Sequence, residues 1–219
     1  MADVILFGLQ DYAELAHYYL EHDSPHRVVA FCVNEDYIPE LRTYKGIPIV
    51  AFEDVSNTHP PEAFSFFAPM SPRHMNRDRE AVYQAIKSKG YPMISYVSSR
   101  TTSFGNEIGE NCFILEDNTL QPFTSIGNNV VLWSGNHIGH HGRIHDHVTI
   151  TSHVVMSGHC EIGKYAFLGV NATLRDRISI GEGTFVAMAA AVMKSTEPWS
   201  VYKGNPAVKL EMQSTGLKI

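Results

Sequence analysis

Cysteine is scarce in this sequence. The chain has 219 residues and three cysteines, Cys32, Cys112 and Cys160, which lie far apart. Three scattered cysteines are too few for a disulfide framework or for a zinc site made of cysteine ligands. We therefore expect the protein to work in a reducing compartment, the cytoplasm.

Long apolar runs and an excess of positive charge are also missing. No stretch of 18 apolar residues occurs, and the chain starts with Met1-Ala2-Asp3 and only a short apolar run, Val4 to Phe7. We therefore predict no membrane span and no secretory signal. The 17 Lys and Arg against 23 Asp and Glu give a formal charge of −6. This balance disfavours a nucleic-acid partner, because such binding needs clustered positive charge.

The first 97 residues alternate between strand-like and helix-like patterns. Short apolar runs predict buried strands, and apolar residues at helical spacing predict amphipathic helices. The predicted strands are residues 4–7, 27–33, 46–50, 64–68 and 93–97, and the predicted helices are residues 11–22 and 76–89. This alternation is typical of a small, mostly parallel, Rossmann-like α/β sheet.

From residue 98 onward the sequence follows a period of six. The positions in register are Ile108, Ile114, Leu120, Ile126, Leu132, Ile138, Ile144, Ile150, Met156, Ile162, Leu168, Leu174, Ile180, Val186 and Val192. All are aliphatic, and the residue four places after each is mostly small or β-branched. A period of six fits neither an α-helix nor a flat sheet. It is the signature of a parallel β-helix built from hexapeptide repeats.

Three hexads make one triangular coil of 18 residues, so residues 18 apart lie above one another at a spacing of about 4.8 Å. The aliphatic residue and the residue four places later point inward, and the glycine that often follows the aliphatic residue is expected at the tight corner. Stacking of this kind predicts a ladder of Asn118 and Asn136 inside the prism. It also predicts that His141 and His159 stack.

The two halves together resemble the hexapeptide-repeat sugar acyltransferases of the sialic-acid O-acetyltransferase type. Within that group the chain is similar to bacterial N-acetyltransferases of nucleotide-linked amino sugars, such as those of bacillosamine pathways. The hexad register and the segment Tyr202-Lys203-Gly204-Asn205-Pro206-Ala207 carry the resemblance. It implies a nucleotide-sugar-binding α/β domain, residues 1–97, followed by a left-handed parallel β-helix with a C-terminal tail, residues 98–219.

The resemblance also implies an activity. We expect a cytoplasmic homotrimer that uses acetyl-CoA to acetylate an amino group of a nucleotide-linked sugar of the 4-amino-deoxy type, in surface polysaccharide biosynthesis. The sugar, the nucleotide base and the acyl group are not encoded in any motif of the chain. O-acetylation stays open, although a hydroxyl asks more of a general base than an amine does.

Seven of the twelve histidines fall between residues 137 and 159. In the family, the general base lies two residues after the aliphatic position of a hexad in the middle of the prism, which is His140 here. The family commonly places an acidic residue directly after the base, and here that position is His141. We therefore predict His140 and His141 as the catalytic pair, with Asp146 or Glu161 as candidates to orient His140.

The same resemblance suggests where the two substrates bind. Acetyl-CoA is expected at Gly158, Ala189, Lys203 and Thr149, with a backbone N–H near Gly158 available to an oxyanion. The nucleotide sugar is expected at a set of residues in the first half: Gly8, Gln10, Asn34, Glu35, Asp36 and Arg79. The first loop has one glycine and no Gly-x-Gly-x-x-Gly motif, which argues against a nicotinamide-dependent dehydrogenase.

Two other functions are consistent with these patterns. The histidine-rich hexads fit a zinc enzyme like the γ-class carbonic anhydrases, whose zinc is held by three histidines across a trimer interface, but that class lacks the N-terminal α/β domain. A regular prism can also be a non-catalytic scaffold that only assembles into trimers. We predict no bound metal for catalysis.

Overall fold

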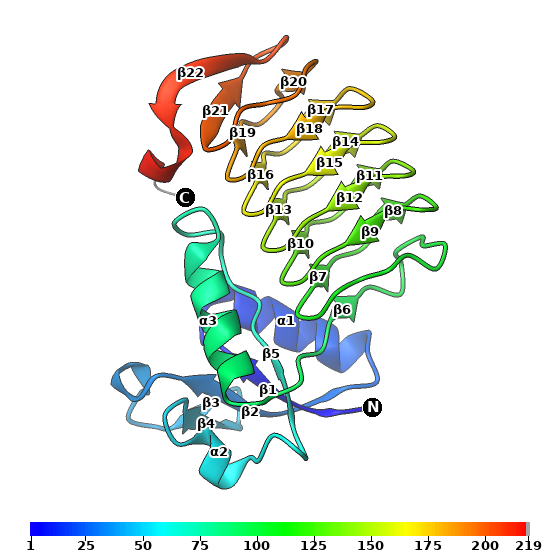
Figure 1. Ribbon diagram of the computed structural model, residues 1–219. Helices are drawn as coiled ribbons and strands as arrows, with labels where there is room; N and C mark the ends of the chain where they lie inside the picture. Colours follow the sequence, from blue (N-terminus) through cyan, green and yellow to red (C-terminus); the bar gives the residue numbers. More distant parts are fainter. Residues whose placement is uncertain (218–219) are drawn as a thin grey trace.

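A computed structural model describes residues 1–217 of the chain. Figure 1 shows a small α/β unit joined to a tall stack of triangular coils. Two residues of the predicted second domain, 218 and 219, lie outside the described part. Within residues 1–217 no helix has the length and apolar character needed to cross a bilayer.

The α/β unit contains a five-stranded sheet with the order β3-β4-β2-β1-β5. Its strands are β1 (Asp3–Phe7), β2 (Arg27–Val33), β3 (Thr43–Tyr44), β4 (Ile47–Ala51) and β5 (Ser65–Phe67). All neighbouring strands pair in parallel except β3 and β4, which pair antiparallel. The strands are apolar on both faces because helices cover both faces, as in other parallel sheets.

Two apolar clusters lie on the two sides of this sheet. One side is packed by Ala13, Ala16 and Leu20 of α1 (Asp11–His22). The other side is packed by Tyr83 and Ile86 of α3 (Arg77–Ser88), together with the short α2 (Val55–Thr58). The sequence predicted the two long helices and four of the strands closely, and it missed α2, β3 and the 3-10 turn Glu35–Tyr37.

The last strand predicted for the first half divides between the two units. Met93 forms an isolated parallel bridge with Phe66 at the edge of the α/β sheet. Tyr96 and Val97, which form β6, instead pair with β7 and begin the stack of coils. The prediction that residues 93–97 close the α/β unit is therefore wrong for its last two residues.

The stack of coils is a three-sided parallel β-helix. One side is formed by β6 (Tyr96–Val97), β7 (Phe113–Ile114), β10 (Val131–Leu132), β13 (Thr149–Ile150), β16 (Phe167–Leu168) and β19 (Phe185–Val186). The second side is formed by β8 (Thr119–Leu120), β11 (His137–Ile138), β14 (Val155–Met156), β17 (Thr173–Leu174) and β20 (Ala191–Val192). The third side is formed by β9 (Ser125–Ile126), β12 (Arg143–Ile144), β15 (Glu161–Ile162) and β18 (Ser179–Ile180). Strand partners are 18 residues apart, as Val131 with Thr149 and His137 with Val155, which confirms the predicted coil length.

The interior of the prism follows the six-residue register. Fourteen of the fifteen predicted aliphatic positions close the strands β7 to β20, and Ile108 forms an isolated bridge with Ile126. The predicted asparagine ladder is confirmed, because Asn118 and Asn136 are both fully buried. The Oδ1 of Asn118 accepts the N–H of Asn136, and the Oδ1 of Asn136 accepts the N–H of Val154 at 2.7 Å.

The corners of the prism use glycine differently from the prediction. The left-handed residue of each corner lies three places after the aliphatic residue, and it is usually a polar residue such as Asn129, His141 or His159. Glycines directly after the aliphatic residue, such as Gly139, do not have a left-handed backbone. They are needed because a Cβ there would lie 2.5 Å from the backbone of the next coil.

A hairpin that the sequence did not reveal closes the top of the prism. Its strands are β21 (Ser200–Lys203) and β22 (Val208–Gln213), and β21 continues the first side beside β19. The Gly-Asn-Pro-Ala segment forms the turn of this hairpin, and its Ala207 packs against the end of the prism core. A 3-10 turn, Ser214–Gly216, follows.

Candidate active site

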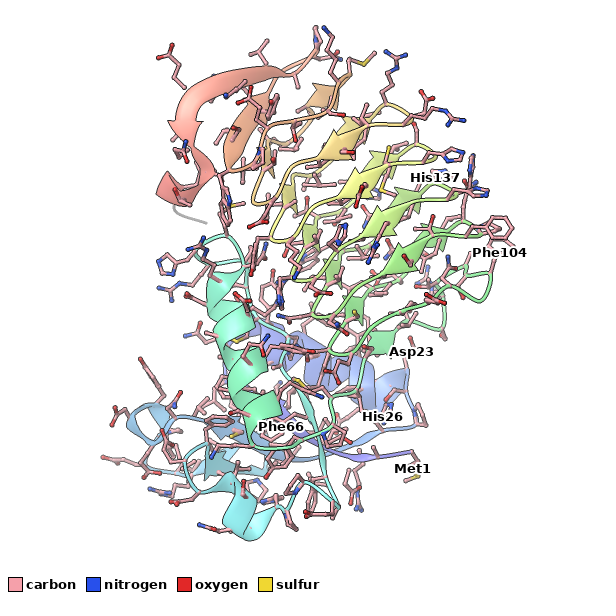
Figure 2. All side chains as sticks on the ribbon, in the orientation of Figure 1. Met1, Asp23, His26, Phe66, Phe104 and His137 are labelled. Atoms are coloured by element: carbon pink, nitrogen blue, oxygen red, sulfur yellow. The ribbon has the colours of Figure 1, made fainter. Side chains whose placement is uncertain are left out.

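Three histidines meet at one edge of the prism. His140 and His141 lie in the corner between β11 and β12, and His159 takes the place of His141 one coil later. The rings of His141 and His159 stack with centroids 4.9 Å apart, which confirms the predicted stack. His140 lies edge-on to both rings, 5.2 Å from His141 and 5.1 Å from His159. All three side chains are exposed. Figure 2 labels His137, the first residue of β11, on the right of the prism.

Gly158 creates the space that the His140 ring occupies. Residue 158 lies one coil beyond residue 140, and a Cβ at position 158 would lie 2.6 Å from His140 Cε1 and 2.7 Å from Nε2. Contacts this short do not occur between real side chains. The glycine therefore permits the ring position.

His141 occupies the position at which the resemblance led us to expect an acidic partner for the base. Nδ1 of His140 and Nδ1 of His141 lie 3.0 Å apart, so one ring donates a hydrogen bond and the other accepts it. When His140 is the donor, its Nε2 has the free lone pair that a general base needs. The backbone N–H of His140 donates to Oε1 of Gln121 at 3.0 Å and fixes the start of the corner.

The two carboxylates considered for orienting His140 are engaged elsewhere. Oδ1 of Asp146 accepts the backbone N–H of Asn128, one coil earlier, at 2.8 Å. Oε1 of Glu161 lies 2.6 Å from Nε2 of His145. Among the residues that the structure describes, the ring of His140 is hydrogen-bonded to His141 and to neither carboxylate.

Positive charge is disfavoured at the third histidine of the edge. The pKa of His159 is lowered first by desolvation and then by the positive charge of Arg177. His141 and His140 lower it further, whereas the negative charge of Asp176 raises it. Lowering the pKa of an imidazole favours its neutral form, which retains a free ring nitrogen.

A second candidate site is a cavity of about 460 Å³ in the α/β unit. It opens where β1, β2 and β5 end, which is where parallel α/β sheets commonly bind ligands. Its walls are formed by Phe7, Gly8, Leu9, Gln10, Asp11, Tyr12, Ala13, Val33, Tyr37, Pro69, Met70, Ser71, Arg73 and Asp78. The predicted residues Gly8 and Gln10 lie in this wall. Gly8 has φ +113°, a conformation that side chains rarely adopt, so the turn from β1 into α1 requires glycine.

The other residues predicted for the nucleotide lie beside this cavity. Asn34, Glu35 and Asp36 are exposed and form the loop between Val33 and Tyr37, which do line the cavity. Glu53 holds this loop, because its carboxylate accepts the side-chain amide of Asn34 at 2.9 Å and the backbone N–H of Glu35 at 3.0 Å.

The sequence did not single out Tyr37, Arg73 and Asp78 as wall residues. These residues follow the carboxyl ends of β2 and β5 in the chain, and that position could have indicated that they line the cavity. Nδ1 of His74 and Oδ1 of Asp78 are 2.8 Å apart, and Nε of Arg73 lies 3.9 Å from the same carboxylate. The cavity wall therefore carries charges of both signs.

Arg79 and Thr149 have structural positions and are not open to a ligand. Both are buried at the contact between α3 and the prism, and the Arg79 guanidinium donates to Thr149 Oγ1 at 3.0 Å. It also donates to the carbonyl oxygens of Asn129, His147 and Val148, each at 3.1 Å. Burial lowers the pKa of Arg79 to about 10. These contacts join the two units, so neither residue is retained in the proposed ligand sites.

The remaining residues predicted for acetyl-CoA are exposed. Ala189 lies at a corner of the upper prism with φ +57°, and Lys203 ends β21 beside the hairpin turn. Lys209, on the other strand of the hairpin, forms an ion pair with Glu197. Lys203 is thus an exposed cation near the top of the same prism that carries the histidines.

Comparison with curated proteins finds relatives of part of the chain, and no protein-family model matches it. A probable macrolide acetyltransferase of Lysinibacillus sphaericus is 37% identical over 58 residues, which is 26% of this chain and 32% of that protein. An acyl-(acyl-carrier-protein)–UDP-N-acetylglucosamine O-acyltransferase of Campylobacter concisus is 29% identical over 132 residues, or 57% of this chain and 50% of that protein. The chain thus spans about a third to a half of the length of these relatives.

Solved structures resemble the chain over almost all of its length. Perosamine N-acetyltransferase of Caulobacter crescentus, in complex with CoA and GDP-perosamine, matches with a TM-score of 0.83 and 18% identity, covering 97% of this chain and 98% of that chain. The acetyltransferase domain of PglB from Neisseria gonorrhoeae matches with a TM-score of 0.84 and 17% identity, covering 96% and 100%. WeeI from Acinetobacter baumannii matches with a TM-score of 0.79 and 21% identity, covering 96% and 100%. The chain therefore has the fold of these proteins over almost all of its length, and the predicted resemblance to the hexapeptide-repeat sugar acyltransferases is confirmed for the fold.

Proposed function

We propose that this protein is an acetyl-CoA-dependent N-acetyltransferase of a nucleotide-linked amino sugar of the 4-amino-deoxy type. The observation that carries the proposal is the open imidazole of His140, positioned by Gly158 on a prism of this fold. The similar perosamine N-acetyltransferase is described with CoA and GDP-perosamine, and the PglB domain with acetyl coenzyme A. A cytoplasmic location and a role in surface polysaccharide biosynthesis belong to the same proposal.

His140 is the proposed general base. Its Nε2 accepts a proton from the amine as the nitrogen attacks the thioester carbonyl, the carbon–sulfur bond then breaks, and the proton leaves with the CoA thiol. No covalent intermediate with the protein is needed. General-base catalysis of this type contributes about 10²- to 10⁴-fold to a rate.

His141 is the proposed positioning residue for that base. As a neutral acceptor it receives the Nδ1–H of His140 and so leaves the His140 Nε2 lone pair free. A protonated His141 would donate instead and would hold a proton on Nε2 of His140. His141 thereby orients His140 as a carboxylate would, but it adds no negative charge that would strengthen the base. A weaker base is enough for an amine acceptor, whereas a hydroxyl acceptor asks more of the base.

The N–H of Gly158 is the proposed donor to the thioester oxygen. In the part of the chain that the structure describes, this N–H donates to no acceptor. It belongs to the residue that touches the His140 ring, so a donor and a base lie together. Donors already in place stabilise the negative charge of the transition state without reorganising. Ala189 and Lys203 are proposed to extend the acetyl-CoA site along the prism.

The cavity at the ends of β1, β2 and β5 is the proposed nucleotide site, with Gly8 and Gln10 in its wall and Asn34, Glu35 and Asp36 at its rim. The N-terminus of α1 offers backbone N–H groups there, a setting that favours phosphate. Arg73 adds a cation to the same wall. We assign this role to the Rossmann-like domain predicted at residues 1–97, whose last two residues, Tyr96 and Val97, already pair with the prism. We assign acetyl transfer to the left-handed β-helix domain predicted at residues 98–219.

The positions of the two proposed sites support the homotrimer that we propose. In Figure 1 the start of α3, which borders the cavity, is on the left of the molecule, and β11, which leads to His140, is near the right edge. This separation supports the proposal that the cavity and the base that act together belong to different chains. We propose that a neighbouring chain supplies the missing side of each active site.

The test combines binding with turnover. Acetyl-CoA and a set of GDP-, UDP- and dTDP-linked amino sugars are screened for an increase in melting temperature, because a ligand that binds only the native state stabilises it. Release of free thiol is then measured on the sugars that bind. His140→Asn should lose on the order of 10²-fold or more in turnover, whereas His22→Gln, an exposed histidine of α1, should retain it. Full turnover by His140→Asn would overturn the proposal.

A further inference from the structure

We propose that His140, His141 and His159 form a binding site for a transition-metal cation such as Zn²⁺, and that the bound ion stops acetyl transfer by occupying the ring of His140. The metal site stands on geometry alone. The inhibition rests on the function proposed above.

The geometry comes close to that of a three-histidine metal site. Each of the three residues offers one ring nitrogen, and these atoms all lie within 4.8 Å of one another. Around zinc, bonds of about 2.0–2.1 Å set nitrogen–nitrogen separations of about 3.3–3.5 Å. The Nδ1 atoms of His140 and His141 are 3.0 Å apart. All three side chains are exposed, so small rotations are enough to bring their nitrogens around one ion.

The donor set selects the class of metal. Three imidazoles suit zinc, copper and nickel, whereas magnesium and calcium prefer oxygen ligands. The charges beside the site oppose each other, because Arg177 places a positive charge near His159 and Asp176 a negative one. All three ligands come from one chain, whereas the zinc site of the γ-class carbonic anhydrases lies across a trimer interface.

Metal binding and base catalysis exclude each other at His140. An imidazole nitrogen that is bonded to a metal has no lone pair with which to take a proton. If the ion binds Nε2, it occupies the nitrogen that is proposed to accept the proton. If it binds Nδ1, it removes the hydrogen bond to His141 that keeps Nε2 free.

The first experiment measures binding without any acetylation assay. Zn²⁺ is titrated by calorimetry into the metal-free full chain, and metal content is measured by elemental analysis after dialysis. We expect one ion per chain for the wild type and affinity lowered on the order of tenfold or more in His159→Asn. His153→Asn is the matched control, because His153 is also an exposed corner histidine, with φ +60° against +58° for His159. Asparagine tolerates this backbone well in both variants.

The second experiment measures the consequence. Zinc should inhibit thiol release by the wild type with the midpoint found in the titration, and a chelator should restore the rate. His159→Asn should keep its rate at that zinc concentration, and His153→Asn should be inhibited like the wild type. Absence of saturable binding, or equal affinity in His159→Asn, overturns the site, and binding without inhibition overturns the competition. If no sugar is acetylated, the proposed function fails while the titration still decides the site.

Discussion

The ring of His140 and the backbone of Gly158 are in direct contact across two successive coils of the prism. Even one added carbon at position 158 would lie 2.6 Å from His140 Cε1. The two residues are 18 apart, so the coil length brings them together. A side chain at residue 158 and the present position of the imidazole are therefore incompatible.

The first prediction concerns this contact. Gly158→Ala should displace the His140 ring and lower acetyl transfer on the order of tenfold or more, because misplacement of a reacting group by about 1 Å can cost about 10²-fold. The overall fold should persist, as judged by circular dichroism. Gly216→Ala is the control, since a Cβ there meets nothing within 4 Å. Equal rates for the two variants would show that the ring position is not important for turnover.

The second prediction concerns the joint between the two units. Arg79→Met should lower the free energy of unfolding by about 3 kcal/mol, because it leaves the buried carbonyl oxygens of Asn129 and His147 without their Arg79 donor. Denaturant titration measures the change. Arg27→Met, which removes a surface ion pair with Asp3, should cost less than about 1 kcal/mol. Similar losses in both variants would contradict a structural role for Arg79.

The third prediction concerns the asparagine ladder. Asn136→Ala should cost about 2–4 kcal/mol, because it removes the acceptor of the buried Val154 N–H and leaves a small cavity. Asn57→Ala, at an exposed position of α2, should change stability by less than about 0.5 kcal/mol. Thermal unfolding of the two variants beside the wild type provides the comparison.

The fourth prediction concerns stability and pH. Burial lowers the pKa of His147 below its ordinary value of 6.5. As the pH falls below about 6.5, the unfolded chain takes up a proton that the folded chain resists, so stability is full above pH 7 and is lost toward pH 5. Burial also lowers the pKa of His17, His26 and His59, which adds to the loss in the same direction.

The measurement is the free energy of unfolding at several pH values between 5 and 8. One such histidine contributes a slope of up to about 1.4 kcal/mol per pH unit. His147→Asn should therefore show a shallower loss of stability toward low pH than the wild type. Asp23, whose pKa is held at about 2 by hydrogen bonds from Ser99 and Tyr96, does not titrate in this range. An unchanged slope in His147→Asn would contradict the prediction.

The repeat made much of this fold predictable. An unbroken register from Ile108 to Val192 indicates which residues point inward, because neighbouring coils bury the same position again and again. The stack of His141 on His159 and the ladder of Asn118 and Asn136 follow from the same spacing of 18 residues. The C-terminal hairpin was not predictable in this way, since its strands lie beyond the last repeat.

The sequence by itself determined the two units, the coil length and the column in which each histidine lies, because those properties depend on short-range periodicity. Only the tertiary structure decided which side chains meet between the α/β unit and the prism, and which rings meet at an edge of the prism. It placed Nδ1 of His140 beside a histidine rather than a carboxylate, and it buried Arg79 against the prism. Such contacts depend on the packing of α3 and on the orientation of rings at a corner, and no spacing within the chain records either.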